Sequence, residues 1–112
     1  MRPVEWQMVK TYFRYLTEED RVRCQINVEK GNVESFVIQY EILIGNQWSP
    51  VTRFDTFHEG VHRDLIEPGG KVMKKWFLHL GFDEGLTFAY NDIEKNWDRY
   101  RQRYLSKLEK KL

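Results

Sequence analysis

Apolar and polar residues alternate along two neighbouring stretches of the chain, residues 21–29 and residues 33–44. In both stretches the apolar side chains occupy mainly even-numbered positions. A period of two residues is that of a β-strand with one buried face. Two such strands bury the same face only if the loop between them holds an odd number of residues. We therefore expect three-residue turns at residues 30–32 and, before the next strand, at residues 45–47.

Weaker patterns predict strands on either side of this pair. Residues 9–16 contain an aromatic run that favours a strand, although their apolar positions also fit one face of a helix. A strand over residues 48–56 should turn Val51 outward, and Pro50 predicts an edge position or a bulge near its start. After a Pro-Gly-Gly turn, residues 72–77 form a last short strand.

A hairpin is predicted around the loop at residues 57–60, because a polar segment there separates two strand patterns. With a four-residue loop, Asp55 faces His62 across the ladder and Arg53 faces Asp64. Opposite charges then meet twice on one face of the sheet. The same register turns the neighbouring arginine, at position 63, toward the core side, where it would need an acidic partner or an edge to reach past.

A long helix is predicted from Asp83 onward, with that aspartate as the N-cap. Its apolar residues recur at spacings of three and four and form one stripe that can cover the even face of the sheet. The stripe consists of Leu86, Tyr90, Ile93, Trp97, Tyr100 and Tyr104. The expected fold is therefore α+β, a single domain over residues 1–112 in which an antiparallel meander of about five strands packs against one long C-terminal helix.

Composition narrows the class of protein. The 18 basic and 17 acidic residues nearly balance, so nucleic-acid binding would need a local basic patch. No apolar run approaches the roughly 18 residues of a membrane span, and the N-terminus lacks the order of a signal peptide. We expect a cytoplasmic protein that does not engage a membrane. The single cysteine, Cys24, excludes an internal disulfide, and its even position predicts a buried thiol.

Candidate chemistry concentrates in residues 53–64, where two histidines, two aspartates, a glutamate and two arginines lie within one short segment. This segment resembles an uncharacterised family of small prokaryotic proteins with the pattern R-[FY]-D-x-x-H-x-x-x-H-R-D and a following P-x-G turn. The residues that match are Arg53, Phe54, Asp55, His58, His62, Arg63 and Asp64, with Pro68, Gly69 and Gly70 in the turn. The helix over residues 86–101 is also similar, so the likeness covers about residues 33–104. The shorter histidine core is similar to that of certain toxins of prokaryotic toxin–antitoxin operons, which implies action on RNA or growth control, an antitoxin partner and no known cofactor.

The first functional hypothesis is metal-free chemistry on RNA, as a nuclease or transferase. His62, oriented by Asp55, would act as general base, and His58 would protonate the leaving oxygen. Imidazole suits both roles because it titrates near neutral pH. An arginine would stabilise the charge that develops on phosphorus. The residues expected to bind the substrate are Arg53, Arg63 and Asp64, and Arg23, Gln25, Gln39 and Lys74 on the same sheet face could follow the backbone.

Two other interpretations of the motif remain open. His58 and His62 with Asp55 or Asp64 form a ligand set of the type that binds catalytic zinc, but Gly60 interrupts a spacing that is most convincing on a helix. We rank this metal site below the metal-free one. Alternatively, the charged pairs only hold the hairpin in register, each contributing well under ~1 kcal/mol if exposed.

The last interpretation is a non-enzymatic module that binds a protein or forms a homodimer. The aromatic residues are too many to bury in so small a domain, and apolar surface left over marks interfaces. The examples are Trp6, Tyr12, Trp48 and Trp76. A homodimer could form through the N-terminal strand, because it leaves a sheet edge unpaired.

Overall fold

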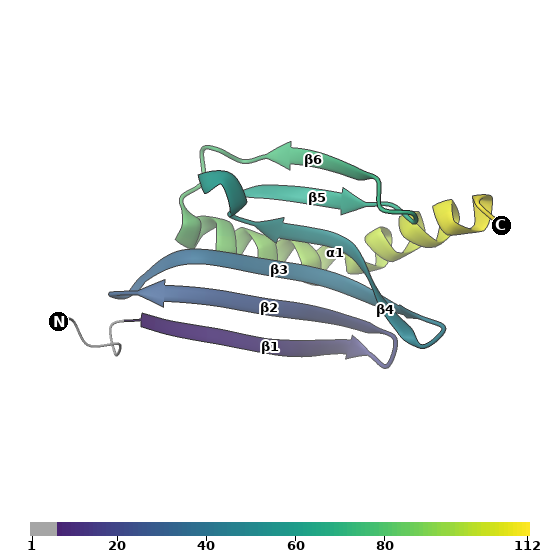
Figure 1. Ribbon diagram of the computed structural model, residues 1–112, viewed down its shortest axis with the longest axis horizontal. Helices are drawn as coiled ribbons and strands as arrows, with labels where there is room; N and C mark the ends of the chain where they lie inside the picture. The colour runs from purple at the N-terminus through teal and green to yellow at the C-terminus, as the bar shows by residue number, and fades with distance from the viewer. Residues whose placement is uncertain (1–6) are drawn as a thin grey trace.

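The computed structural model describes residues 7–112 as a six-stranded antiparallel sheet with one long helix against one of its faces (Figure 1). The strands follow one another in the sheet in sequence order, as in a meander. They are β1 (Gln7–Thr17), β2 (Asp20–Glu29), β3 (Asn32–Ile44), β4 (Gln47–Asp55), β5 (His62–Ile66) and β6 (Val72–Trp76). A short 3-10 turn, η2 (Phe57–Glu59), connects β4 to β5, and helix α1 (Phe82–Lys110) completes the chain.

The predicted α+β meander with a C-terminal helix is confirmed, but the sheet has six strands instead of about five. The strand expected over residues 9–16 is present as β1, which pairs with β2 along nearly its whole length. Of the aromatic residues expected at an interface, Trp6 lies outside the described residues. The described part of the chain contains no helix with the length and apolar character needed to span a membrane.

The turns between strands β2, β3 and β4 are shorter than predicted. Lys30 and Gly31, with φ angles of 52° and 81°, form a two-residue turn in place of three residues. The odd count that the apolar pattern requires is supplied by a β-bulge, which leaves Glu34 without a partner on β2. The β3–β4 hairpin repeats this arrangement, with a two-residue turn and a bulge that leaves Val51 unpaired.

The bulge in β4 changes the orientation of Val51. This residue was expected to face outward, but it is buried, with 3% of its surface exposed, because the bulge breaks the strict alternation of the strand. The prediction of a bulge near Pro50 is confirmed. Proline fits there because it cannot donate a hydrogen bond to a regular ladder.

The core lies between the even-numbered face of the sheet and helix α1, which packs mainly on β3 and β4. The predicted stripe residues of the helix all contact this core. The N-cap is Gly81 and not Asp83 as predicted. The Gly81 N–H donates to Glu84 Oε1 at 2.9 Å, so the side chain of this glutamate pairs with a backbone N–H at the start of the helix. Asp83 lies inside the first turn and therefore cannot act as the N-cap.

Gly85 packs against Val61, the residue that directly precedes β5. A Cβ atom at this position would lie 2.6 Å from Val61 Cγ2 and 3.0 Å from Val61 Cγ1. We expect Gly85→Ala to destabilise the fold by about 1–3 kcal/mol through overpacking, although alanine is the better helix former by about 1 kcal/mol. Chemical denaturation would measure this difference. Thr87→Ala, on the exposed side of the same turn, should be neutral or slightly stabilising, and a Gly85→Ala variant more stable than the wild type would contradict the packing described.

A buried carboxylate connects the helix to the sheet at the opposite end of the core. Asp20 is 2% exposed, and its Oδ1 accepts hydrogen bonds from Tyr40 Oη at 2.6 Å and from Arg101 Nη1 at 2.7 Å. Burial alone would raise the pKa of Asp20, but the hydrogen bonds from Thr17, Tyr40 and Arg101 and the charge of Arg101 together lower it. The carboxylate therefore joins the start of β2 to the middle of β3 and to the C-terminal half of α1.

Candidate functional site

A cavity of about 850 Å³ lies on the face of the sheet opposite helix α1, which we call the outer face. The odd-numbered residues of β2 and β3 point toward this face, because the even-numbered ones fill the core. The cavity is bounded by the β4–β5 hairpin and by β2 and β3. The lining side chains with polar or aromatic groups are Arg23, Gln25, Ser35, Phe36, Gln39, Arg53, Asp55, Thr56, Phe57, His58, His62, Asp64 and Lys74.

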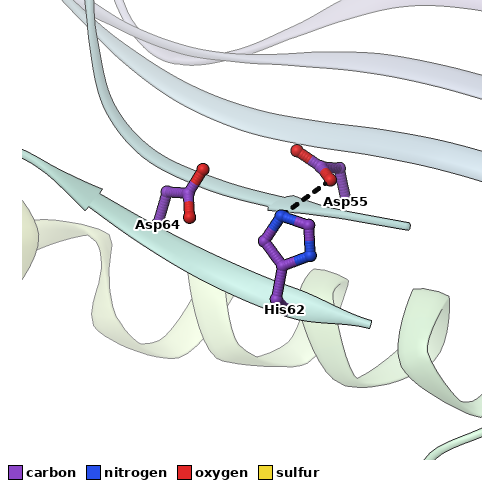
Figure 2. A group of neighbouring side chains, drawn as sticks. All are labelled: Asp55, His62 and Asp64. Carbon is purple, nitrogen blue, oxygen red and sulfur yellow. Dashed lines mark ion pairs between the residues drawn. The ribbon is translucent and has the colours of Figure 1, made fainter. Parts of the chain in front are cut away.

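The register of the β4–β5 hairpin is the predicted one. Asp55 faces His62 and Arg53 faces Asp64, across a loop of four residues after Thr56. Figure 2 shows Asp55, His62 and Asp64 pointing to the same side of the two strands, away from α1. The alternation of the strands thus brings together groups that the sequence separates by up to eleven positions.

His62 is held on both of its ring nitrogens. Nε2 lies 2.9 Å from Asp55 Oδ1, and Nδ1 lies 3.1 Å from the carbonyl oxygen of Gly60. Both ring nitrogens are thereby engaged by neighbouring oxygen atoms, one from the backbone and one from a side chain. The ring is 1% exposed and packs against Trp76 at 4.7 Å between centroids. His62 is therefore placed to orient Asp55, with neither nitrogen free for a substrate.

Gly60 makes this arrangement possible through its lack of a side chain. A Cβ atom there would lie 2.9 Å from Leu78 Cδ2 and 3.0 Å from the ring of Trp76. The loop can therefore rest directly on the segment around β6, and its carbonyl group reaches His62. The glycine that interrupts the histidine spacing in the sequence serves close packing in the structure.

Asp55 presents one free oxygen to the cavity. Its Oδ1 accepts two hydrogen bonds, from His62 Nε2 at 2.9 Å and from the Phe57 N–H at 2.8 Å. Among the described residues no donor lies within hydrogen-bond distance of Oδ2. Because Asp55 lines the cavity, Oδ2 is the atom that remains available to accept a proton or a hydrogen bond from a ligand.

Asp64 is neutralised by two cations. Lys74 Nζ donates to Oδ1 at 2.8 Å, and Arg53 Nη1 lies 3.6 Å from Oδ2. Arg53 in turn donates from Nε to Gln39 Oε1 at 2.7 Å. The guanidinium is thereby fixed at the cavity wall while remaining partly exposed. These contacts make Asp64 a residue that positions cations, and Arg53 and Lys74 the groups that face a ligand.

His58 and Arg63 occupy very different surroundings. His58 is exposed at the cavity rim in the left-handed conformation, with φ 64° and ψ 30°, and its ring centroid lies 4.3 Å from that of Phe57 at a tilt of 53°. A non-glycine residue held there marks a locally strained loop. Arg63 lies opposite Phe54 on the face covered by α1, where it is close to Tyr100. Burial and the hydrogen bond to Asp92 raise the pKa of Tyr100, and Arg63 opposes this rise.

Five of the six predicted site residues therefore surround one cavity, and Arg63 lies apart from them on the other face of the sheet. The residues expected to follow a backbone, including Arg23 and Lys74, also line the cavity. The sequence analysis did not single out Ser35, although its odd position places it on the outer face. It also did not point to Trp76, which faces His62 from β6 and follows only from the register across the Pro68 turn.

The charges of the cavity favour an anionic ligand. Three permanent cations, Arg23, Arg53 and Lys74, line it together with the two carboxylates of Asp55 and Asp64. Lys74 and Arg53 pair with Asp64, and the three cations outnumber the two carboxylates. Among the side chains that the structure describes, no carboxylate pairs with Arg23. The cavity therefore carries net positive charge.

A metal ion could be held by a different set of residues from the one predicted. One donor atom each from Asp55, His62 and Asp64 lies within 4.8 Å of the others, so Asp64 takes the place expected for His58 (Figure 2). Two carboxylates and one imidazole suit a divalent cation. Such an ion would compete with Lys74 for Asp64 and would replace the contact between His62 Nε2 and Asp55.

Comparison with known proteins finds one related family. Residues 2–110 match the family described as Domain of unknown function (DUF7718). No curated protein and no solved structure matches the chain. The expectation of an uncharacterised family is thereby confirmed, while the histidine pattern as its hallmark and the likeness to toxins stay predictions.

Proposed function

We propose, from the premise that the chain belongs to the domain family DUF7718, that the protein cleaves single-stranded RNA in the outer-face cavity, as a toxin-like nuclease. One observation carries this proposal. The carboxylate of Asp55 has one oxygen held by two N–H donors and the other open to a cavity with net positive charge. A fixed base beside cations is the arrangement that phosphodiester cleavage by an internal hydroxyl requires.

The ligand class follows from the groups that line the cavity. Arg23, Arg53 and Lys74 supply charged donors for phosphate oxygens, and the side chains of Gln25 and Gln39 supply neutral donors and acceptors. A phosphodiester backbone needs both kinds of group. The cavity on the outer face suits an unpaired strand, because bases and backbone can lie on the sheet surface together.

The reaction uses the hydroxyl that distinguishes RNA from DNA. Asp55 Oδ2 takes the proton of the ribose 2′-hydroxyl, and the 2′-oxygen forms a bond to phosphorus. The bond from phosphorus to the 5′-oxygen breaks, and His58 protonates that oxygen. The products are a 2′,3′-cyclic phosphate and a 5′-hydroxyl end. Arg53 stabilises the charge on phosphorus, and His62 acts as a positioning residue for Asp55.

Salt-dependent binding tests the ligand class. Arg23→Ala should bind a single-stranded RNA more weakly than the wild type and should lower the slope of log K against log salt by about 0.7, the value for one phosphate contact on a single strand. Fluorescence anisotropy over a salt series would measure both. Arg99→Ala removes the same charge from the exposed face of α1 and should leave the slope unchanged.

Cleavage of RNA but not of DNA of the same sequence completes this test, because only RNA carries the 2′-hydroxyl. Equal cleavage of both strands would contradict the proposed reaction. Equal salt slopes for the wild type and Arg23→Ala would contradict the proposed binding site.

A second candidate is a non-enzymatic module that forms a homodimer, and the long edge strand β1 favours it. Its 11 residues form one edge of the sheet, and Met8, Val9 and Tyr15 are more than half exposed. An unprotected edge can pair with a second copy. In that case the cross-strand pairs Asp55 with His62 and Arg53 with Asp64 only fix the hairpin register. This candidate would be favoured if light scattering detected dimers whose fraction rises with protein concentration and if the protein bound no RNA. An antitoxin partner of the nuclease, in contrast, would cover the cavity.

A further inference from the structure

We infer that Phe13, Tyr15, Arg21 and Trp48 form a base-stacking subsite for single-stranded RNA next to the cavity on the outer face. We call these four residues the aromatic subsite. The inference rests on the proposed RNA substrate and specifies how the strand lies: phosphates in the cavity, and a neighbouring base on the rings of Phe13 and Tyr15. It assigns a function to the surplus of aromatic residues, which the cavity does not use.

The rings are held in place by a central guanidinium. The Arg21 Cζ atom lies 4.1 Å from the ring centroid of Phe13 and 4.1 Å from that of Trp48. Its Nε donates to Glu41 Oε1 at 2.7 Å, which fixes the side chain. Tyr15 meets Trp48 edge to face, with 6.0 Å between centroids and 69° between planes. The aromatic subsite is therefore ordered before any ligand arrives, which reduces the entropy cost of binding.

The two outer rings are nevertheless open to solvent. Tyr15 is 59% exposed and Phe13 is 43% exposed. Arg21 lies over one face of the Phe13 ring and donates to the Tyr15 hydroxyl at 3.4 Å, and the remaining ring surface is open to a ligand. Every nucleobase has a flat aromatic face, so rings presented in this way bind bases with little dependence on sequence.

The aromatic subsite is continuous with the cavity. Across the β1–β2 ladder Phe13 faces Arg23, and Arg23 lines the cavity. Tyr15 faces Arg21, two positions along the same strand and therefore about 7 Å farther on.

A chain of hydrogen bonds also joins the two parts of the outer face. Gln39 donates to Glu41 at 2.6 Å and accepts from Arg53 at 2.7 Å, and Glu41 binds Arg21. These contacts fix the spacing between the aromatic subsite and the phosphate-binding arginine. A ligand that occupies both parts meets one rigid surface.

The chemistry of the surface favours a nucleic acid over a peptide strand. A peptide that adds to the sheet would pair with the backbone edge of β1 and would not need the ring faces. Exposed aromatic rings beside Arg23, which has no carboxylate partner among the described side chains, match a ligand with flat bases and a negative backbone.

The test compares an RNA of about 12 nucleotides, within the site sizes seen for sheet-based binders, with an abasic strand of the same length. Anisotropy would give both affinities for the wild type, Phe13→Leu and Tyr15→Leu. We expect each variant to bind RNA about 5- to 100-fold more weakly, the loss for one stacked base, and to bind the abasic strand like the wild type. Tyr15→Phe keeps the ring and should retain RNA binding. Val9→Ala, an apolar truncation on the same strand, should have no effect.

The outcomes separate this inference from the proposed function. If the wild type binds RNA and the abasic strand equally well, or if both leucine variants bind RNA like the wild type, the aromatic subsite does not bind bases, while the cavity remains an RNA site. If the wild type binds neither strand, the proposed function fails and the inference fails with it. The unfolding midpoints of the two leucine variants should be compared with that of Tyr15→Phe. Equal midpoints would show that weaker RNA binding by a leucine variant is not caused by loss of the fold.

Discussion

Asp55→Asn is expected to lower the rate of RNA cleavage by about 10²- to 10⁴-fold, the usual contribution of a positioned general base. Asparagine keeps the shape of the side chain and can still accept the hydrogen bonds that Phe57 and His62 donate. In asparagine an amide nitrogen replaces the second oxygen, and this nitrogen cannot take a proton from the substrate. Single-turnover cleavage of a labelled RNA would measure the rate without a contribution from product release.

Two comparisons make this prediction specific. RNA affinity should change little in Asp55→Asn, because the phosphate-binding cations Arg23, Arg53 and Lys74 are intact. Glu18→Gln makes the same chemical change at an exposed turn and should cleave at the wild-type rate. If Asp55→Asn also cleaved RNA at the wild-type rate, the carboxylate would not be the general base. The motif would then only hold the hairpin in register.

Asp20→Ala is expected to destabilise the fold by about 3–5 kcal/mol, the cost of breaking a buried charged pair by removing one partner. The Tyr40 hydroxyl is fully buried and would lose its acceptor, while Arg101 would lose its closest carboxylate. Urea denaturation would give the difference in the free energy of unfolding. The adjacent variant Glu19→Ala removes only an exposed contact to Arg101 at 3.5 Å and should change stability by less than about 1 kcal/mol.

The same carboxylate predicts a pH dependence. The pKa of Asp20 is lower in the folded protein than its ordinary value of 3.8. Its contribution to stability is therefore complete above that value and is lost as the pH falls toward the lower folded pKa. The gap in stability between the wild type and Asp20→Ala should narrow on acidification. A constant gap down to about pH 2 would contradict the hydrogen-bonded, ionised carboxylate. A double-mutant cycle that combines Asp20→Ala with Tyr40→Phe would isolate the contribution of the Tyr40 hydroxyl to this difference in stability.

The alternation of apolar residues predicted most of the fold, because a buried sheet face leaves a period of two in the sequence. It placed β2, β3 and the stripe of α1 correctly, and the β4–β5 register followed from the loop length. It did not predict the bulges at Glu34 and Val51, since an odd turn and an even turn with a bulge satisfy the same pattern. The N-cap at Gly81 was missed because backbone groups and Glu84 supply the cap.

The composition of the site was easier to predict than the roles of its members. Cross-strand pairing is local, so the sequence brought Asp55 and His62 together. The surroundings of His62 depend on Gly60 and on Trp76, and Trp76 comes from a third strand whose register depends on the turn before it. Only the three-dimensional arrangement shows that both imidazole nitrogens are occupied, which moves the proposed base from His62 to Asp55.

The pairing of a tight turn with a bulge has a consequence for how the chain can change in length. In the β2–β3 hairpin, one residue added to the turn at Lys30 and Gly31 could be offset by deletion of the unpaired Glu34. The same side chains would then still face the cavity, because their phase depends only on the total count. Either change alone would turn the side chain of every later residue in the strand to the opposite face of the sheet. Homologous chains should therefore show insertions and deletions here in compensating pairs.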